Sequence, residues 1–415
     1  MVPPPELIFR SVGPNIWTIS RDFSLGKGEH EHLTDKAITS RLSCLNNATK
    51  VEDCVGHANL QESTREELNE ECAQMKAFRA AKAKNKPFTF PLQTRMTVVL
   101  DPSNGELFLH SVVDLDEEVE KAWDKFILEL KEKSSTGNVT LGGIICPNLQ
   151  HWTFVVSWLK KFPELIRIYV VPSYGSENLQ NKIVERIEKQ FKSVKDAEIC
   201  KQRLKFIELQ KGNFPPPAAE DDIMHIYNQY ATGGKKSRVL FQVAPLLGAG
   251  IGLNEYMFYH HISHTLLVSD TFYGGFHSHV ADSNSEFSYN GPTWFERVWF
   301  KYNKNGSFQK AALPQYRTAP ERIHSASSLL DTAEAFVKNK DISQIIYAHG
   351  NKCPYTKDDL ENEKFLKEIS SGYPVKIPST LNELFVYCWK VGLNFQQPSG
   401  NAKDLPNMVF SVEGS

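Results

Sequence analysis

The chain has 415 residues, of which 41% are hydrophobic and 23% are charged. This composition is close to the globular average, which excludes disordered and fibrous classes and predicts a substantial core. The chain has 47 Lys and Arg against 49 Asp and Glu residues, a formal net charge of -2, so no overall field favours nucleic acid or an anionic membrane. We therefore expect a small-molecule substrate or ligand, with no nucleic-acid and no membrane partner.

Leader, membrane and cysteine signals all favour a soluble cytoplasmic protein. Residues 1–6 show no basic and apolar leader pattern, and no run of about 18 apolar residues follows. The seven cysteines are widely spaced and include no C-x-x-C pair, which is typical of free thiols in a reducing compartment. The sequence gives no indication of the oligomeric state.

The N-terminal part is expected to hold one strand and a long polar stretch. Residues 15–20 have the apolar content of a strand, whereas residues 21–86 are polar and lack strand-like alternation. Within that stretch, residues 63–84 predict an exposed helix, because Thr64 and Glu67 have capping-box spacing. We interpret 21–86 as an insertion that is partly helical or mobile.

The rest of the chain alternates between strand and helix patterns. A hairpin is predicted from the apolar runs 95–100 and 106–110, which flank the turn sequence Asp101-Pro-Ser-Asn-Gly105. The patterns that follow predict helices at 115–133, 151–161, 177–191, 327–338, 356–369 and 379–390, and strands at 141–145, 166–171, 204–207, 239–243, 255–261, 265–269 and 342–347. Such alternation predicts an α/β fold with helices packed on a sheet.

Four polar residues follow predicted strands, where functional side chains of layered α/β folds usually lie. They are His110, His151, Asp270 and His349. Imidazole and carboxylate are the ligands that zinc and similar divalent metals prefer, and a catalytic metal site needs about three of them plus an open position. For each residue taken alone, a polar group that caps a strand or bonds to a loop carbonyl is the more common explanation. Together they predict a metal site about as strongly as they predict that alternative.

Six segments resemble successive motifs of a branch of the metallo-β-lactamase superfamily whose function is uncharacterised. They are residues 15–19, 95–100, 107–111, 145–151, 265–270 and 346–350. The resemblance covers most of residues 10–370 and implies a four-layer αββα sandwich. It thus implies one domain over 1–415 that contains the 21–86 insertion.

The resemblance also implies a degenerate metal site. His110 stands where typical members have the aspartate of their first motif, and His151 is the sole remaining ligand type in the segment that matches H-x-H-x-D-H. No histidine stands near Ile251, where the third motif is expected. Asp270 matches the metal-bridging aspartate and His349 the terminal histidine. We therefore expect one divalent metal, zinc before iron or manganese, on His151, Asp270 and His349, with His110 as a fourth ligand or orienting base.

The function expected from this site is a hydrolase-like reaction in which a metal-bound water attacks an ester, lactone or thioester bond. Asp270 and His110 are the candidate catalytic residues. The main alternative is a pseudoenzyme without metal that uses the same fold to bind a partner or small molecule. A third interpretation is redox chemistry at a single iron, since two histidines and one carboxylate also suit that metal.

Overall fold

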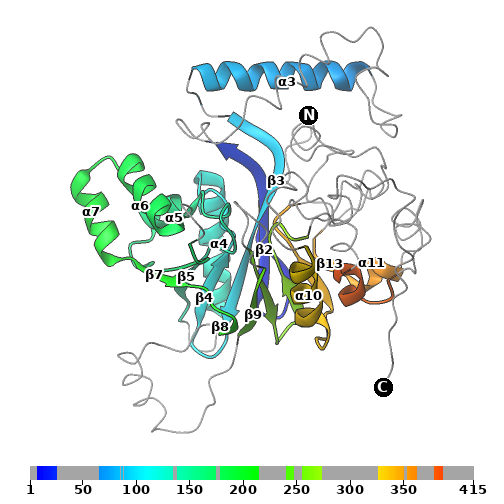
Figure 1. Cartoon of the computed structure of the whole chain (residues 1–415). Helices are drawn as coiled ribbons and strands as arrows, with labels where there is room; N and C mark the ends of the chain where they lie inside the picture. The colour runs from blue at the N-terminus through cyan, green and yellow to red at the C-terminus, as the bar shows by residue number, and fades with distance from the viewer. Residues whose placement is uncertain are drawn as a thin grey trace, which may run out of the picture.

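The computed structural model describes residues 7–25, 65–84, 86, 88–133, 138–173, 178–214, 240–246, 255–272, 326–349, 353–361 and 378–386. These residues form two β-sheets with helices outside them (Figure 1). The helix predicted at 356–369 is described only as far as α11 (Lys357–Glu361), and that predicted at 379–390 is helical over 381–386. In the described part of the chain, no helix is long and apolar enough to cross a bilayer.

The first sheet has seven strands in the order β1-β2-β3-β4-β5-β6-β7. Strands β1 to β4 pair antiparallel and β4 to β7 pair parallel. The strands are β1 (Arg10–Gly13), β2 (Ile16–Leu25), β3 (Phe88–Asp101), β4 (Glu106–His110), β5 (Thr140–Ile145), β6 (Arg167–Val170) and β7 (Lys205–Glu208). The predicted hairpin is β3 and β4, with β3 beginning well before residue 95.

The second sheet has six strands in the order β13-β12-β11-β10-β9-β8. Its pairs are antiparallel except for β11 with β12, which are parallel. The strands are β8 (Gly212–Phe214), β9 (Phe241–Leu246), β10 (Glu255–His260), β11 (Thr265–Leu267), β12 (Gln344–Ile346) and β13 (Tyr355–Thr356). Each sheet therefore contains a parallel pair, β4 with β5 and β11 with β12.

The two sheets pack face to face through large apolar side chains. Phe214 on β8 lies against Phe108 on β4 and Tyr169 on β6, with ring centroids 5.2 and 4.7 Å away. His110 at the end of β4 meets Phe258 on β10 edge to face at 5.3 Å. All of these side chains are buried, so this interface is the hydrophobic core.

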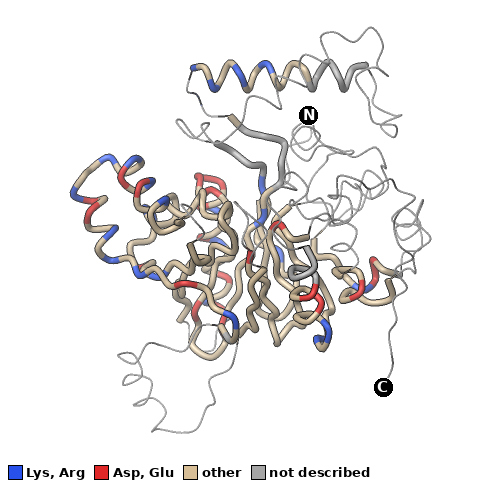
Figure 2. Tube along the Cα trace, viewed as in Figure 1, with Lys and Arg blue, Asp and Glu red and all other residues tan. Residues whose placement is uncertain are grey.

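Helices cover the outer face of each sheet (Figure 1). On the first sheet lie α4 (Glu117–Lys133), α5 (Val155–Lys161), α6 (Leu179–Gln190) and α7 (Val194–Arg203); on the second lie α10 (Ala326–Val337) and α11. Trp123 of α4 packs edge to face on Trp158 of α5 with centroids 5.0 Å apart. Charges of both signs lie on α6 and α7 (Figure 2), in keeping with the small net charge. The fold is a four-layer αββα sandwich, as predicted.

The segment at 21–86 differs in part from its prediction. Strand β2 continues past residue 20 to Leu25, because its pairing with β3 extends as far as Phe88. The helix predicted at 63–84 is α3 (Arg65–Ala83), whose Met75 and Phe78 are buried, and Phe78 meets the Phe88 ring edge to face. Residues 26–64 lie outside the described part. That 21–86 is an insertion within one domain stays a prediction.

Candidate metal centre

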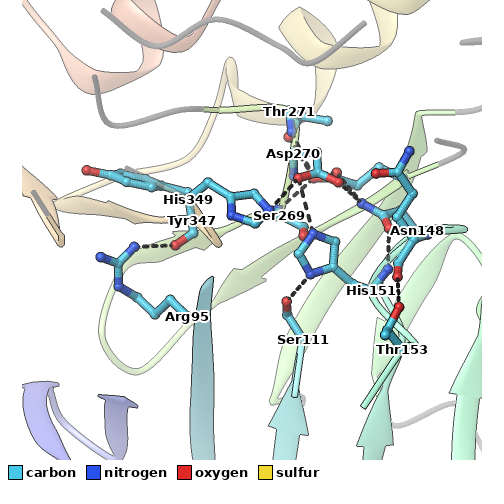
Figure 3. Close-up of polar contacts among 12 residues, drawn as sticks. Arg95, Ser111, Asn148, His151, Thr153, Ser269, Asp270, Thr271, Tyr347 and His349 are labelled. Carbon is cyan, nitrogen blue, oxygen red and sulfur yellow. Dashed lines mark hydrogen bonds and ion pairs between the residues drawn. The ribbon is translucent and has the colours of Figure 1, made fainter. Parts of the chain in front are cut away.

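Strand direction brings three of the four predicted site residues together. Because β4 and β5 run parallel, as do β11 and β12, the loops after these strands meet at one edge of the sandwich. His151 lies in the loop after β5, while Asp270 and His349 follow β11 and β12. Their side chains point toward one another (Figure 3).

The three side chains meet at one carboxylate oxygen. Nε2 of His151 lies 3.1 Å from Oδ1 of Asp270, and Nε2 of His349 lies 3.2 Å from the same atom. One ligand atom from each residue lies within 4.8 Å of the other two. Two imidazoles and a carboxylate are a donor set suited to zinc or another first-row divalent metal, so the residues fit such an ion.

Burial differs among the three residues. Asp270 and His349 are 2% and 5% exposed, whereas the side chain of His151 keeps 11% of its surface accessible. Burial by itself raises the pKa of the Asp270 carboxyl, but the two histidines outweigh it and hold this pKa below its usual range. Asp270 is therefore ionised and can act as an anionic ligand.

Asn148 connects the β5 loop to Asp270. Its Oδ1 accepts the backbone N–H groups of Gln150 and His151, at 2.8 and 2.9 Å. Its Nδ2 donates to Oδ2 of Asp270 at 2.7 Å and to Oε2 of Glu255 at 3.2 Å. This fully buried amide thus fixes the loop that carries His151. It also binds Oδ2 of Asp270, the carboxylate oxygen that the two histidines do not contact.

Glu255, at the start of β10, holds the segment that carries Asp270. Its carboxylate accepts backbone N–H groups from Ser269, Asp270 and Thr271 at 2.7, 2.8 and 3.4 Å, and the Thr271 hydroxyl at 2.8 Å. Burial and then the nearby Asp270 charge raise the pKa of Glu255 to about 7, against the effect of these hydrogen bonds. Sequence patterns identified Glu255 only as the first residue of a strand and missed this contact.

Ser111 is the second residue that the sequence analysis missed. Its Oγ lies 2.5 Å from Nδ1 of His151, on the side of the ring opposite Asp270 (Figure 3). Ser111 directly follows His110, and it lay within the segment 107–111 that carried the resemblance. Its position directly after a strand was therefore a signal for a site residue. That signal was too weak to identify Ser111, because serine and threonine are common at strand ends.

His110 lies beside this group but is not part of it. Among the described residues, the converging ligand atoms belong to His151, Asp270 and His349 alone. His110 is 1% exposed at the end of β4, and burial followed by the neighbouring His151 lowers its pKa to about 3. Its Nε2 has no hydrogen-bond partner. The structure therefore does not place His110 as a fourth ligand, and its catalytic role stays a prediction.

Comparison with known proteins gave solved structures that are similar to this chain at low sequence identity. No protein-family model and no curated protein matches the sequence. DIM-1 metallo-β-lactamase matches with 12% identity over 88% of this chain and 99% of its own, with a TM-score of 0.35. A metallo-β-lactamase from Hirschia baltica matches with 9% identity over 86% and 95%, with a TM-score of 0.35. The Flv1 flavodiiron core from Synechocystis sp. matches with 10% identity over 88% and 61%, with a TM-score of 0.38.

Proposed function

We propose that this chain is a metal-dependent, hydrolase-like protein with a single divalent metal on His151, Asp270 and His349. The observation that carries the proposal is the convergence of these three ligand atoms within 4.8 Å. Zinc is the first candidate, with iron and manganese as alternatives, because all three accept imidazole and carboxylate together. The αββα layers and the strand-end position of the site support a divergent member of the metallo-β-lactamase-like superfamily.

A single metal is favoured by the way the Asp270 carboxylate is used. Oδ1 faces the two histidines, whereas Oδ2 accepts a hydrogen bond from Asn148. A carboxylate that bridged two metals through its two oxygens would need Oδ2, which already accepts the Asn148 amide. Among the described residues, the group of converging ligand atoms contains only His151, Asp270 and His349, so it holds no further histidine for a second ion. We therefore propose one equivalent of metal per chain.

Hydrolysis is the reaction class that such a site supports best. A bound divalent metal lowers the pKa of water to near 7 and polarises a carbonyl oxygen. In such a site, the two histidines and Asp270 would hold the ion, Asp270 would lower its net charge, and the partly exposed His151 would leave one side accessible. We propose a small ester, lactone or thioester as the substrate, met in the cytoplasm.

Hydrolysis by metal-loaded protein tests this function. Metal-free protein would be loaded with zinc, manganese or ferrous iron and offered chromogenic ester, lactone and thioester substrates. We expect turnover of at least one class. Asp270→Asn should reduce this turnover by more than the roughly 10- to 100-fold that is typical when a hydrogen-bond partner of a metal ligand is changed. The matched control is His264→Asn, which alters a surface histidine that contacts Asp341 at 3.6 Å. Turnover that survives in Asp270→Asn would refute the assignment.

The second candidate is a binding protein without catalysis. It is favoured by the hydrogen-bond network, in which both oxygens of Asp270 have protein partners. Such a satisfied polar cluster can serve the fold alone. Under this alternative, no metal-loaded form hydrolyses any substrate class and Asp270→Asn changes stability only.

A further inference from the structure

We propose that Ser111 is a positioning residue whose hydroxyl sets the proton position on His151 and so frees Nε2 for the metal. This inference rests on the proposed metal site and adds a residue to it. The starting observation is that both ring nitrogens of His151 are engaged. Ser111 Oγ lies 2.5 Å from Nδ1, and Asp270 Oδ1 lies 3.1 Å from Nε2 (Figure 3).

In the neutral form of His151, the two contacts favour one tautomer. A neutral imidazole has one donor and one acceptor nitrogen, and an ionised carboxylate can only accept. In that neutral form, Nε2 carries the proton and donates it to Asp270. Nδ1 is then the acceptor, and the hydroxyl of Ser111 donates to it.

Metal binding requires the opposite tautomer. The ion needs the lone pair of Nε2, so the Nε2 proton leaves to water and a proton from water joins Nδ1, with no net release from His151. Nδ1 then needs an acceptor, because a ligating histidine usually donates through its other nitrogen. The hydroxyl of Ser111 keeps its own proton, rotates and accepts. A hydroxyl can serve in both states because it both donates and accepts.

The position of Ser111 suits this role and excludes a nucleophilic one. Its backbone N–H donates to the carbonyl of Ile145 at 3.1 Å, which ties it to the end of β5. The residue is only 3% exposed, so the hydroxyl is closed to a substrate. A Ser–His–Asp sequence of contacts also occurs in acyl-transfer enzymes. Here, however, a second imidazole, that of His349, also converges on Asp270, which gives three ligand-type atoms where a Ser–His–Asp triad has one histidine.

The backbone of Ser111 allows a clean removal of the hydroxyl. Its φ of 58° lies in the left-handed region, which glycine adopts without strain and β-branched residues disfavour. Ser111→Gly therefore deletes the hydroxyl without a backbone penalty. Ser111→Thr keeps the hydroxyl and adds strain. The two variants separate the role in metal binding from a role in folding.

Zinc affinity, measured by competition with a chromogenic chelator, is the test. We expect the Kd for zinc to rise about 10- to 100-fold in Ser111→Gly while its Tm stays near that of the wild type. Ser111→Thr should lower the Tm yet keep a Kd close to the wild-type value. A purely structural role predicts that affinity follows Tm in both variants, and that pattern would overturn the proposal.

Two further outcomes complete the test. Nitrogen-15 NMR of His151 should show the proton on Nε2 in metal-free protein and on Nδ1 after zinc is added. The same tautomer in both states, or labelling of Ser111 by a fluorophosphonate, would overturn the inference. If wild-type protein binds no zinc, the proposed function fails and this inference with it. If the wild type binds zinc and Ser111→Gly binds it equally well, this inference alone fails.

Discussion

Nδ2 of Asn148 lies 2.7 Å from Oδ2 of Asp270, so the amide binds the carboxylate oxygen that the two histidines do not contact. The same Nδ2 also contacts Glu255 at 3.2 Å, which places Asn148 between two buried acids. Because the Nδ2 group of Asn148 donates a hydrogen bond to each acid, it stabilises the two carboxylates close together.

Asn148→Asp is expected to destabilise the metal-free protein strongly. The new carboxyl either repels its two acidic neighbours or takes up a proton at neutral pH, and both cost free energy. We expect the free energy of unfolding to fall by roughly 2 to 4 kcal/mol in urea titrations. Asn104→Asp, at an exposed turn beside Glu106, is the control and should change it by less than about 0.5 kcal/mol. Equal effects of the two changes would contradict the assigned role of Asn148.

Glu255→Gln is expected to weaken both the fold and the metal site. One carboxylate oxygen becomes an NH₂ group that faces backbone donors from residues 269–271, so a buried N–H loses its acceptor. The free energy of unfolding should fall by about 1 to 3 kcal/mol, and zinc affinity by about 10-fold or more. Exposed Glu118→Gln on α4 should change neither quantity. Wild-type zinc affinity in Glu255→Gln would show that the hydrogen bonds from residues 269–271 to Glu255 do not position Asp270 for the metal.

Stability should fall at acidic pH in part through His260. Burial, and then His261, lower the pKa of His260 to about 4, while in the unfolded chain it titrates near its ordinary 6.5. The unfolded state therefore binds the proton first, and the contribution of His260 is complete above pH 6.5 and lost as the pH falls toward 4. Between pH 7 and pH 5 this loss is about 2 kcal/mol.

His260→Gln isolates that contribution. The amide keeps a polar partner for Ser263, whose Oγ lies 2.7 Å from Nδ1 of His260, but it does not titrate. Urea unfolding across this pH range should show a shallower pH dependence in the variant, while His110, whose pKa burial also lowers, makes the same contribution in both proteins. An unchanged pH dependence would show that another group dominates the acid loss.

The rule that functional side chains follow strands predicted most of the candidate site. His151, Asp270 and His349 each follow a strand of a parallel pair, and strand direction places them at strand ends, where we expected site residues. Ser111 and Glu255 could not be found this way. Their roles depend on how a hydroxyl and a buried carboxylate meet another segment in three dimensions. His110 satisfied the same rule as the three candidate ligands, yet it lies in the core against Phe258.

The layers of the fold were predictable, but several short elements were not. Helix α7 lacks an amphipathic pattern because Val194 and Ile199 point to solvent, with 88% and 49% of their surface exposed. Strands β1, β8 and β13 are too short to show alternation and exist through pairing with longer neighbours. Helix α5 begins at Val155 rather than near His151, because residues 151–154 form turns held through Asn148.

The central claim is one divalent metal held by His151, Asp270 and His349, and elemental analysis of purified protein tests it most directly. The protein would be expressed without chelator and measured beside Asp270→Ala and the surface control His264→Asn. We expect about one equivalent of zinc, iron or manganese in the wild type and the control, and almost none in Asp270→Ala. No metal in the wild type, or equal metal in Asp270→Ala, would contradict the account.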